Sequence, residues 1–286
     1  MKTVLIIGVT GFTGQHFLKF VENNKLTESY KFVGCSRSVY KGDLSGIFEH
    51  KICDLLDHNS IKELLRRTSP SLILNFAGSY TEPGLNAMIR QNVEATRNLL
   101  EASLSINSVD KILLIGSAAE YGIPIENPVS ETHPKKPVNV YGLTKLYQSE
   151  LASFYYRTKH VKVLTARTFN LVGDGISKRL SVGNFIHQIK NAKDGVTLEV
   201  GNLQTYRDFL PVEEAIRHYW TLLKKGDPGE AYNVCSGKAT KIESLLKDLI
   251  KKSGKNLDYK THSSFLKKND VQVITGSRLK LNSLYS

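Results

Sequence analysis

Two side chains four residues apart could carry out chemistry in this chain. Tyr141 and Lys145 lie in a segment whose apolar residues recur at helical spacing, so a helix would place both on one face. An ammonium about 4 Å from a phenol, at an effective dielectric of about 20, would lower the pKa of the phenol by roughly 3 pKa units. Such a tyrosine can exchange a proton near neutral pH, whereas an ordinary surface pair with the same spacing has no chemical role.

A glycine-rich turn follows the first apolar run of the chain. Gly8, Gly11 and Gly14 stand three residues apart, between a β-type run and apolar residues at helical spacing. In this order of strand, turn and helix, glycines allow the backbone to approach a pyrophosphate, and the helix N-terminus offers free N–H groups. The turn, with Phe12 and Thr13, therefore predicts a dinucleotide site, although its spacing differs from the commoner Gly-x-Gly-x-x-Gly.

Residues after the next two predicted strands bear on the adenosine half of a dinucleotide. Arg37 follows an apolar run that ends at Gly34. At this place a carboxylate accepts from the 2′-hydroxyl of NAD, whereas an arginine accommodates the 2′-phosphate of NADP. Arg37 therefore favours NADP(H), with NAD(H) as the alternative if it is an ordinary loop arginine. Asp54 and Leu55 follow the third strand, where such folds contact adenine.

Strands and helices alternate over residues 1–170. This alternation is typical of an α/β protein with a Rossmann-like doubly wound parallel sheet, so we assign these residues to a dinucleotide-binding domain. The order changes over residues 171–286. We assign this part mainly to a smaller α/β lobe that binds substrate, with some segments returning to the Rossmann sheet.

Small and polar residues follow two central strands. Ala77 and Gly78 come after the fourth strand, where small residues let the backbone pass close to a cofactor. The fifth strand, residues 111–115, leads to Ser117 at the carboxyl edge of the sheet. Because open α/β folds bind their ligands at this edge, Ser117 becomes a candidate site residue.

Two predicted helices contain polar residues that need an explanation. Ser60 and Glu63 predict a capping box at the start of one helix. Residues 86–104 form a second, long amphipathic helix that contains Asn92. Asparagine is unfavourable in a helix interior, so Asn92 either has a polar partner or lies exposed.

The composition limits the kinds of partner. The chain has 41% hydrophobic and 23% charged residues, as an ordinary soluble globule has. Its net charge of +12 is spread along the chain among acidic residues, so we expect anionic ligands such as nucleotides and no nucleic-acid partner. The three cysteines have neither metal nor disulfide spacing, so we expect no metal and a cytoplasmic location. No apolar run approaches the roughly 20 residues of a membrane span, so we expect no membrane partner.

Four motifs together resemble one family. They are Gly8-x-x-Gly11-x-x-Gly14, Ser117 four residues before Tyr121-Gly122, Tyr141-x-x-x-Lys145, and Arg207-Asp208-Phe209. In this combination, and over essentially its whole length, the chain resembles the extended short-chain dehydrogenases/reductases, the NAD-dependent epimerase/dehydratase family that acts on nucleotide sugars. C-terminal phrases such as Tyr232-Asn233-Val234 are similar to those of the GDP-6-deoxy-4-keto-hexose (GDP-4-keto-6-deoxy-mannose) reductases.

The resemblance implies a Ser-Tyr-Lys site. Tyr141 would donate a proton to the carbonyl oxygen of the sugar as hydride arrives from the nicotinamide, and Ser117 would hydrogen-bond the same oxygen. Lys145 would lower the pKa of the tyrosine and hold the nicotinamide ribose. Asn92 and Thr168 match family positions near the cofactor.

The resemblance also implies contacts to the substrate. Arg207 would bind the nucleotide diphosphate, because a planar guanidinium gives a bidentate, charge-assisted contact. Arg179 would be a second phosphate contact or else a solvated loop arginine. Asn170 matches the segment between nicotinamide and sugar, and we assign Glu120 to the substrate as well.

The residues after Ser117 bear on the reaction type. Related 4,6-dehydratases carry acidic residues there, because expelling the C6 hydroxyl requires a further acid and base. Ala118 and Ala119 occupy these positions, which disfavours dehydration and leaves reduction or C4 epimerisation. Because Arg37 favours NADP(H), we expect an NADPH-dependent reductase of a nucleotide-linked 4-keto-6-deoxy sugar, with GDP favoured. The alternatives are a 4-epimerase that retains NAD and a regulatory dinucleotide-binding protein without catalysis. The resemblance further implies a homodimer.

Overall fold

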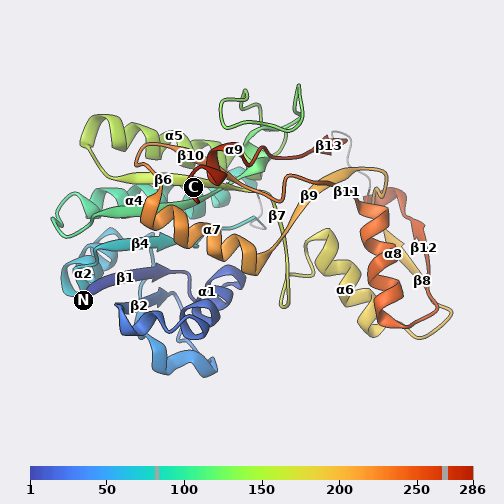
Figure 1. The fold of residues 1–286 in the computed structure, drawn as a ribbon, viewed down its shortest axis with the longest axis horizontal. Coiled ribbons are helices and arrows are strands. Elements are labelled where there is room, and N and C mark those ends of the chain that lie inside the picture. Colours follow the sequence, from blue (N-terminus) through green and yellow to red (C-terminus); the bar gives the residue numbers. More distant parts are fainter. Residues whose placement is uncertain (81–83, 266–269, 286) are drawn as a thin grey trace.

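The computed structural model describes residues 1–80, 84–265 and 270–285. Its main feature is a parallel sheet in the order β10-β6-β5-β4-β1-β2-β3, with helices on both faces (Figure 1). The strands of this sheet are β1 (Lys2–Ile7), β2 (Tyr30–Ser36), β3 (Glu49–Ile52), β4 (Leu72–Asn75), β5 (Lys111–Ser117), β6 (Val163–Thr168) and β10 (Ala231–Val234). The strand order reverses between β1 and β4, which is the point where such sheets bind ligands. The predicted Rossmann-like fold is confirmed.

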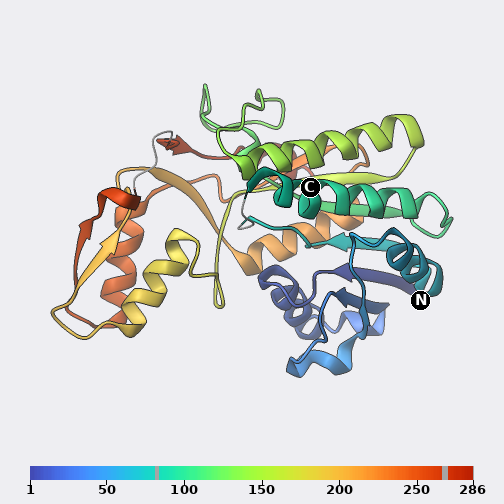
Figure 2. The same cartoon turned by 180° about the vertical axis from the view of Figure 1, so that it is seen from behind.

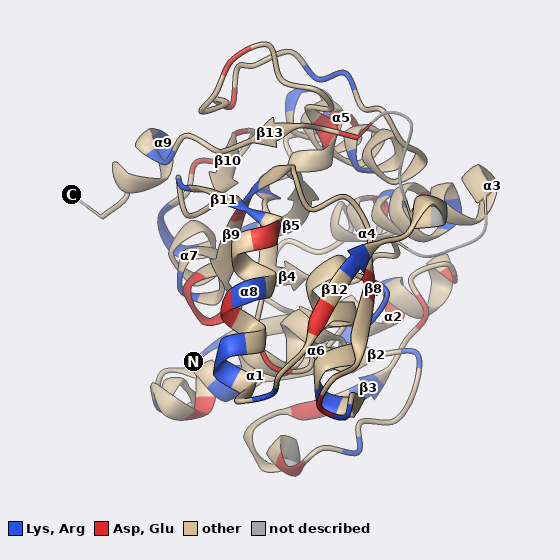
Figure 3. Cartoon of the chain, turned by 90° about the vertical axis from the view of Figure 1, so that its right-hand side faces the viewer, with Lys and Arg blue, Asp and Glu red and all other residues tan. Residues whose placement is uncertain are grey.

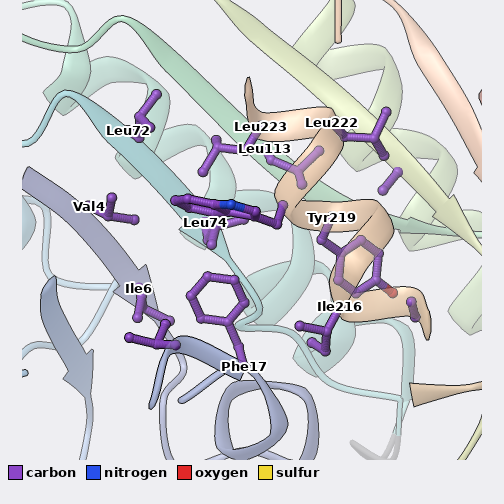
Figure 4. Close-up of a cluster of buried hydrophobic side chains, with 14 of the residues drawn as sticks. Val4, Ile6, Phe17, Leu72, Leu74, Leu113, Ile216, Tyr219, Leu222 and Leu223 are labelled. Carbon is purple, nitrogen blue, oxygen red and sulfur yellow. The ribbon is translucent and has the colours of Figure 1, made fainter. Parts of the chain in front are cut away.

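Two layers of helices cover this sheet. One layer consists of α1 (Phe12–Asn23) and α7 (Val212–Lys225), and the other of α2 (His58–Thr68), α4 (Ala95–Ser103) and α5 (Val140–Lys159). Figure 4 shows Phe17 of α1 and Tyr219 of α7 packed against Leu74 and Leu113 of the sheet. Full burial of each such side chain contributes about 1.5–3 kcal/mol to the stability of the folded protein. The sheet whose carboxyl edge carries the site is therefore held by a well-packed core.

Helix α7 follows from simple sequence rules. Apolar residues recur every three or four positions and all face the sheet. The first turn carries Glu213 and Glu214, and the last carries Lys224 and Lys225, which suits the helix dipole. This helix places Tyr219 beneath the carboxyl end of β6, where its hydroxyl meets Thr168.

The predicted capping box at the start of α2 is wrong. Asp57 is the N-cap, and its Oδ1 accepts from the backbone N–H groups of Asn59 and Ser60 at 3.0 and 3.1 Å. Glu63 instead forms an ion pair with Arg66 on the helix surface. An aspartate three residues earlier therefore takes the role predicted for Ser60.

The long helix predicted for residues 86–104 is present, but it contains an irregular turn. Its three parts are α3 (Gly84–Ile89), the π-helical turn η3 (Arg90–Glu94) and α4. Asn92 lies in the π-helical turn. Such turns insert an extra residue into a helix and occur frequently at functional sites.

The C-terminal part contains a lobe that extends from the main sheet (Figures 1 and 2). Strand β9 (Tyr206–Pro211) pairs with β7 (Asn170–Val172), β11 (Ala239–Lys241) and β13 (Val273–Ile274), while β8 (Thr197–Val200) pairs with β12 (Asp258–Thr261). Helices α6 (Ser181–Asn191) and α8 (Ile242–Ser253) pack together around a separate apolar cluster. In contrast, β10, α7 and α9 (Leu279–Asn282) pack with the main sheet.

The remaining short 3₁₀ turns are η1 (Leu26–Glu28), η2 (Asp43–Ile47), η4 (Ala118–Glu120) and η5 (Ser263–Phe265). Figure 3 shows Lys and Arg distributed over several elements, with Asp and Glu between them. In the described part of the chain, no helix combines the length and apolar character that a membrane crossing requires.

Candidate active site

The carboxyl edge of the sheet brings Ser117, Tyr141 and Lys145 together. Ser117 ends β5 and is the register partner of Thr168, which ends β6. Tyr141 and Lys145 lie in the first two turns of α5, which packs against β5 and η4. The three residues of the predicted Ser-Tyr-Lys site therefore converge, although they come from two separate elements.

The start of α5 is fixed by a cap and by close packing. The side chain of Asn139 accepts from the N–H of Gly142 at 2.8 Å, which satisfies one free donor of the first turn. A Cβ on Gly142 would lie 2.4 Å from the carbonyl oxygen of Ala119. Glycine is thus required here, and it lets α5 approach η4 closely enough to bring Tyr141 to Ser117.

The ammonium of Lys145 is directed into the protein. Lys145 is 4% exposed, and its Nζ donates to the carbonyl oxygen of Ile115 at 2.6 Å and to Oε1 of Gln148 at 2.5 Å. Burial lowers the pKa of Lys145 to about 8, and the charge of Glu120 opposes this change.

The phenol of Tyr141 has a different environment. Burial raises the pKa of Tyr141 to about 12, and a hydrogen bond with Ser117 opposes this rise. The predicted lowering of this pKa by Lys145 is wrong for this structure, because the ammonium is bound by Ile115 and Gln148 instead. Tyr141 is therefore held in its protonated form, the form that a proton donor needs.

The glycine turn before α1 forms a cradle with no room for side chains. Gly8 has φ 85°, and a Cβ on it would lie 3.0 Å from the backbone nitrogen of Ala77. A Cβ on Gly14 would lie 2.4 Å from the carbonyl oxygen of Gly8. Gly11 is the N-cap of α1 and supplies no side-chain cap, so the first N–H groups of the helix, beginning at Phe12 and Thr13, have no capping side chain. This cradle fits the pyrophosphate of a dinucleotide.

Asn92 is a buried connector between two parts of the site. It is 1% exposed, so the alternative of an exposed residue is excluded. Its Nδ2 donates to the carbonyl oxygen of Ser79 at 2.8 Å and to Oγ1 of Thr144 at 3.0 Å, while its Oδ1 accepts from Ser79 N–H. A Cβ on Gly78 would lie 3.2 Å from this Oδ1 and 3.7 Å from Nζ of Lys145. Asn92 thus ties the loop after β4 to α5.

The predicted adenosine contacts lie after β2 and β3. Arg37 directly follows β2; its side chain is exposed and has no partner among the described residues. Asp54 is exposed, whereas Leu55 is buried and its carbonyl oxygen accepts from the side chain of Asn98 at 2.8 Å. An unpaired guanidinium at this position suits a 2′-phosphate.

The predicted substrate contacts are more scattered. Asn170 is exposed at the start of β7, and Arg179 is exposed in the loop before α6. Arg207 on β9 is partly buried, and its Nη2 donates to Oδ1 of Asp270 at 2.8 Å. Binding of a diphosphate by Arg207 therefore requires exchange or sharing of this carboxylate. The hydroxyl of Thr168 is shared with Tyr219 at 2.8 Å.

The prediction that Glu120 contacts substrate does not fit the structure. Glu120 has no exposed surface. Its Oε1 accepts from the N–H of Ser117 at 2.9 Å, and its Oε2 accepts from Nε of Arg167 at 3.1 Å. A side chain with no exposed surface cannot touch a ligand, so Glu120 belongs to the support of the site.

Sequence reasoning missed two residues of this support. Gln148 follows Lys145 by three positions on α5, which is a spacing that a helix prediction could have used. Arg167 lies within the buried strand β6 and binds Glu120, 47 positions earlier in the chain. No local signal connects these two residues, since only the pairing of β5 with β6 brings them together.

Comparisons with known proteins identify the family of this chain. A family model described as GDP-mannose 4,6 dehydratase matches residues 5–279. GDP-6-deoxy-D-mannose reductase of Pseudomonas aeruginosa is 30% identical over 240 residues, which cover 80% of this chain and 78% of that protein. GDP-6-deoxy-D-talose 4-dehydrogenase of Aggregatibacter actinomycetemcomitans is 24% identical over 281 residues, covering 97% of this chain and 89% of that protein. UDP-glucose 4-epimerases and dTDP-D-glucose 4,6-dehydratases also match, so similarity alone leaves the reaction open.

Comparison with solved structures also finds a similar fold over almost the whole chain. The structure of RMD from Pseudomonas aeruginosa complexed with NADPH has a TM-score of 0.83 to this chain at 25% identity. The match covers 99% of this chain and 92% of that chain. Both the sheet and the C-terminal lobe therefore have counterparts in a solved structure.

Proposed function

Since the chain belongs to the GDP-mannose 4,6 dehydratase family, within the NAD(P)-dependent epimerase/dehydratase enzymes of the short-chain dehydrogenase/reductase type, we propose that it reduces the 4-keto group of a GDP-linked 6-deoxy-hexose. One observation carries this proposal. Ser117, Tyr141 and Lys145 converge at the carboxyl edge of the sheet, and no exposed acidic side chain adjoins Ser117 in η4.

The proposed reduction divides the work among three side chains. The nicotinamide dinucleotide would supply the hydride. Tyr141, protonated because burial raises its pKa, donates its proton to the oxygen of the 4-keto group. Ser117 donates a hydrogen bond to the same oxygen as negative charge develops on it. Lys145, charged below its pKa of about 8, binds the nicotinamide ribose.

The residues of η4 favour reduction over dehydration. Loss of the C6 hydroxyl requires an acid and a base beside the sugar. Ala118 and Ala119 offer neither, and the carboxylate of Glu120 is enclosed and paired with Arg167. The family description includes dehydratases, but the residues of η4 do not offer the acid and base that such a reaction needs.

We favour NADPH as the cofactor, with NADH as the alternative. The exposed Arg37 after β2 supports this choice, since no carboxylate stands there to bind a 2′-hydroxyl. The similar structure of RMD is a complex with NADPH. A reductase must release its oxidised cofactor after each turnover, which an exposed 2′-phosphate contact permits.

We propose a homodimer formed through α4 and α5. Helix α5 carries the large apolar side chains of Tyr147, Phe154 and Tyr156 on its exposed surface. Large apolar groups that recur on one helix are typical of an interface. Light scattering of the purified protein would give twice the mass of the chain, and a single-chain mass would rule this assembly out.

The test uses purified protein, NADPH and GDP-4-keto-6-deoxy-mannose. We expect oxidation of NADPH in equal amount to the loss of the keto sugar, with a GDP-6-deoxy-hexose as the product by NMR. Parallel reactions with NADH and with a dTDP-linked keto sugar would define the cofactor and the nucleotide. Absence of NADPH oxidation with every keto sugar would contradict the reductase proposal.

Two other outcomes correspond to the alternatives. Interconversion of C4 epimers of a nucleotide sugar, with NAD retained on the protein, identifies an epimerase. Binding of a dinucleotide with no turnover of any nucleotide sugar identifies a regulatory protein. The intact Ser117-Tyr141-Lys145 set favours the enzyme, because a purely regulatory protein does not need a buried phenol hydrogen-bonded to a serine at the carboxyl edge of the sheet.

A further inference from the structure

We propose that Glu120, held by Arg167, is a positioning residue of the Ser-Tyr-Lys site: it fixes the backbone of Ser117 and supplies a negative charge to the ammonium of Lys145, which is bound two residues earlier on the same strand, at Ile115. This inference rests on the proposed function. It gives a role to a buried ion pair that neither the cofactor nor the substrate touches.

The first part of the role is geometric. Ser117 Oγ accepts from Ala119 N–H at 3.1 Å, while Glu120 Oε1 accepts from Ser117 N–H at 2.9 Å, which completes a capping box around η4. A Cβ on Gly116 would lie 2.7 Å from this Oε1, so the strand leaves space for the carboxylate. The last residue of β5 is thus clamped from both sides, and the serine hydroxyl is kept toward Tyr141.

The second part of the role depends on a fixed charge. Arg167 is 5% exposed and uses Nε for Glu120. Its Nη1 donates to the hydroxyl of Tyr121 at 3.2 Å and to the carbonyl oxygen of Glu131 at 2.8 Å. Tyr121 in turn donates to Oδ1 of Asn233 at 2.7 Å. The guanidinium is therefore bound by the hydroxyl of Tyr121, which directly follows η4, and by the backbone at Glu131, so it cannot turn away from Glu120.

The groups around Glu120 show where its charge acts. Burial raises the pKa of Glu120, but Arg167, the N–H of Ser117 and Lys145 all oppose this rise. The negative charge in turn opposes the lowering of the Lys145 pKa by burial. It also adds to the raised pKa of Tyr141, on which Tyr80 acts in the same direction.

Lys145 depends on this charge because its direct partners are neutral. The carbonyl oxygen of Ile115 and the amide of Gln148 accept from the ammonium, and no carboxylate of a described residue forms an ion pair with it. A buried ammonium without a nearby anion loses its proton readily. Glu120 therefore acts through Lys145 and Ser117 and does not touch the reacting atoms.

The test compares wild type with the neutral pair Glu120→Gln/Arg167→Gln. In this double variant the amide oxygen introduced at position 120 can accept from Ser117 N–H, and the amide nitrogen beside it can donate to the second glutamine, so the hydrogen bonds persist without the charges. The proposal predicts that the alkaline fall of kcat moves down by about one pH unit, so kcat falls about fivefold at pH 8 and about tenfold at pH 9 and above. The single Glu120→Gln variant should show a movement at least as large with a lower Tm, since it leaves the positive charge of Arg167 unpaired.

Asp208→Asn is the matched control. Asp208 is also fully buried, and it accepts from the N–H groups of Ser236 and Gly237 at 2.7 and 2.9 Å. Its replacement should lower the Tm but leave the alkaline limb of kcat in place. Both measurements use NADPH and the keto sugar that wild type reduces.

The result separates two failures. If wild type reduces no keto sugar, the proposed function fails before the variants are compared. If wild type is active and the folded double variant has the same pH profile, the charge role of Glu120 is overturned. A movement of the limb in Asp208→Asn as large as that in the double variant would also overturn it, because any buried carboxylate would then have the same effect.

Discussion

The residues proposed to transfer the proton, here called the catalytic side, and those proposed to bind the sugar nucleotide, here called the substrate side, differ in burial and pairing. Ser117 and Lys145 are buried, and protein groups within about 3 Å satisfy their polar atoms. In contrast, Asn170 and Arg179 are exposed, and Arg207 has a carboxylate partner that a ligand would have to displace. A buried polar group must be paired and is thereby fixed, whereas an exposed group can rearrange. The proton-transfer geometry therefore exists before ligands bind, while recognition of the sugar nucleotide is completed on binding.

Replacement of Tyr141 by phenylalanine would break the catalytic side most strongly. The change removes only the phenol hydroxyl, so we expect a loss of kcat of about 10³-fold with little change in Tm. Tyr30→Phe removes a hydroxyl at the amino end of β2, which is the opposite edge of the sheet, and should leave kcat unchanged. Comparable kcat values for Tyr141→Phe and wild type, measured by NADPH oxidation, would refute the assignment of the proton donor.

Replacement of Arg207 by alanine tests the substrate side. A charge-assisted contact contributes about 1.5–3 kcal/mol, so KM for the keto sugar should rise about 10- to 100-fold while kcat changes little. The KM of Arg207→Lys should lie between those of wild type and Arg207→Ala, since lysine keeps the charge but loses the bidentate geometry. A fall in kcat with an unchanged KM would place Arg207 on the catalytic side and remove the contrast.

The pH dependence of wild type sharpens the comparison further. Burial lowers the pKa of Lys145 to about 8, so the charged form is fully present below this pH and is lost as pH rises through it. We expect kcat to fall about tenfold for each pH unit above this value. KM for the nucleotide sugar should stay constant over the same range, because the guanidinium of Arg207 remains charged. A pH-independent kcat between about pH 7 and 9.5 would show that Lys145 does not have to be charged.

Replacement of Arg37 by alanine should have the smallest effect. Arg37 is exposed, so loss of its contact with a 2′-phosphate should raise KM for NADPH about tenfold. KM for NADH should not change, which makes NADH the internal control. An equal rise for both cofactors would indicate that Arg37 supports the fold of the adenosine pocket and does not select the cofactor.

The parts of the site that depend on local spacing could be predicted from the sequence. Gly8, Gly11 and Gly14 form a cradle because strand, turn and helix follow directly in the chain. Tyr141 and Lys145 share a helix, so their spacing indicated their proximity, but not the direction of the ammonium. The direction of the Lys145 ammonium depends on the carbonyl oxygen of Ile115, which lies on β5 and is distant in the sequence.

Glu120 and Ser60 show two different reasons for error. The role of Glu120 depends on Arg167, which reaches it only through strand pairing, so the sequence alone assigns this polar residue, three positions after Ser117, to the substrate. The prediction of a cap at Ser60 was wrong for a local reason: Asp57 accepts from the first N–H groups, so the helix starts earlier. Tertiary pairing and competition between neighbouring caps therefore limit what spacing rules can give.

The π-helical turn at residues 90–94 has a consequence for how this chain can change. Each residue of a regular helix rotates the next by about 100°, so removing the extra residue would turn everything on one side of it to a new face. Either Asn92 would leave Thr144, or Leu99 and Leu100 would leave the core. A single deletion here would therefore either break the connection that Asn92 makes between the loop after β4 and α5, or lower the stability of the core. We expect insertions and deletions in related sequences to lie outside this turn.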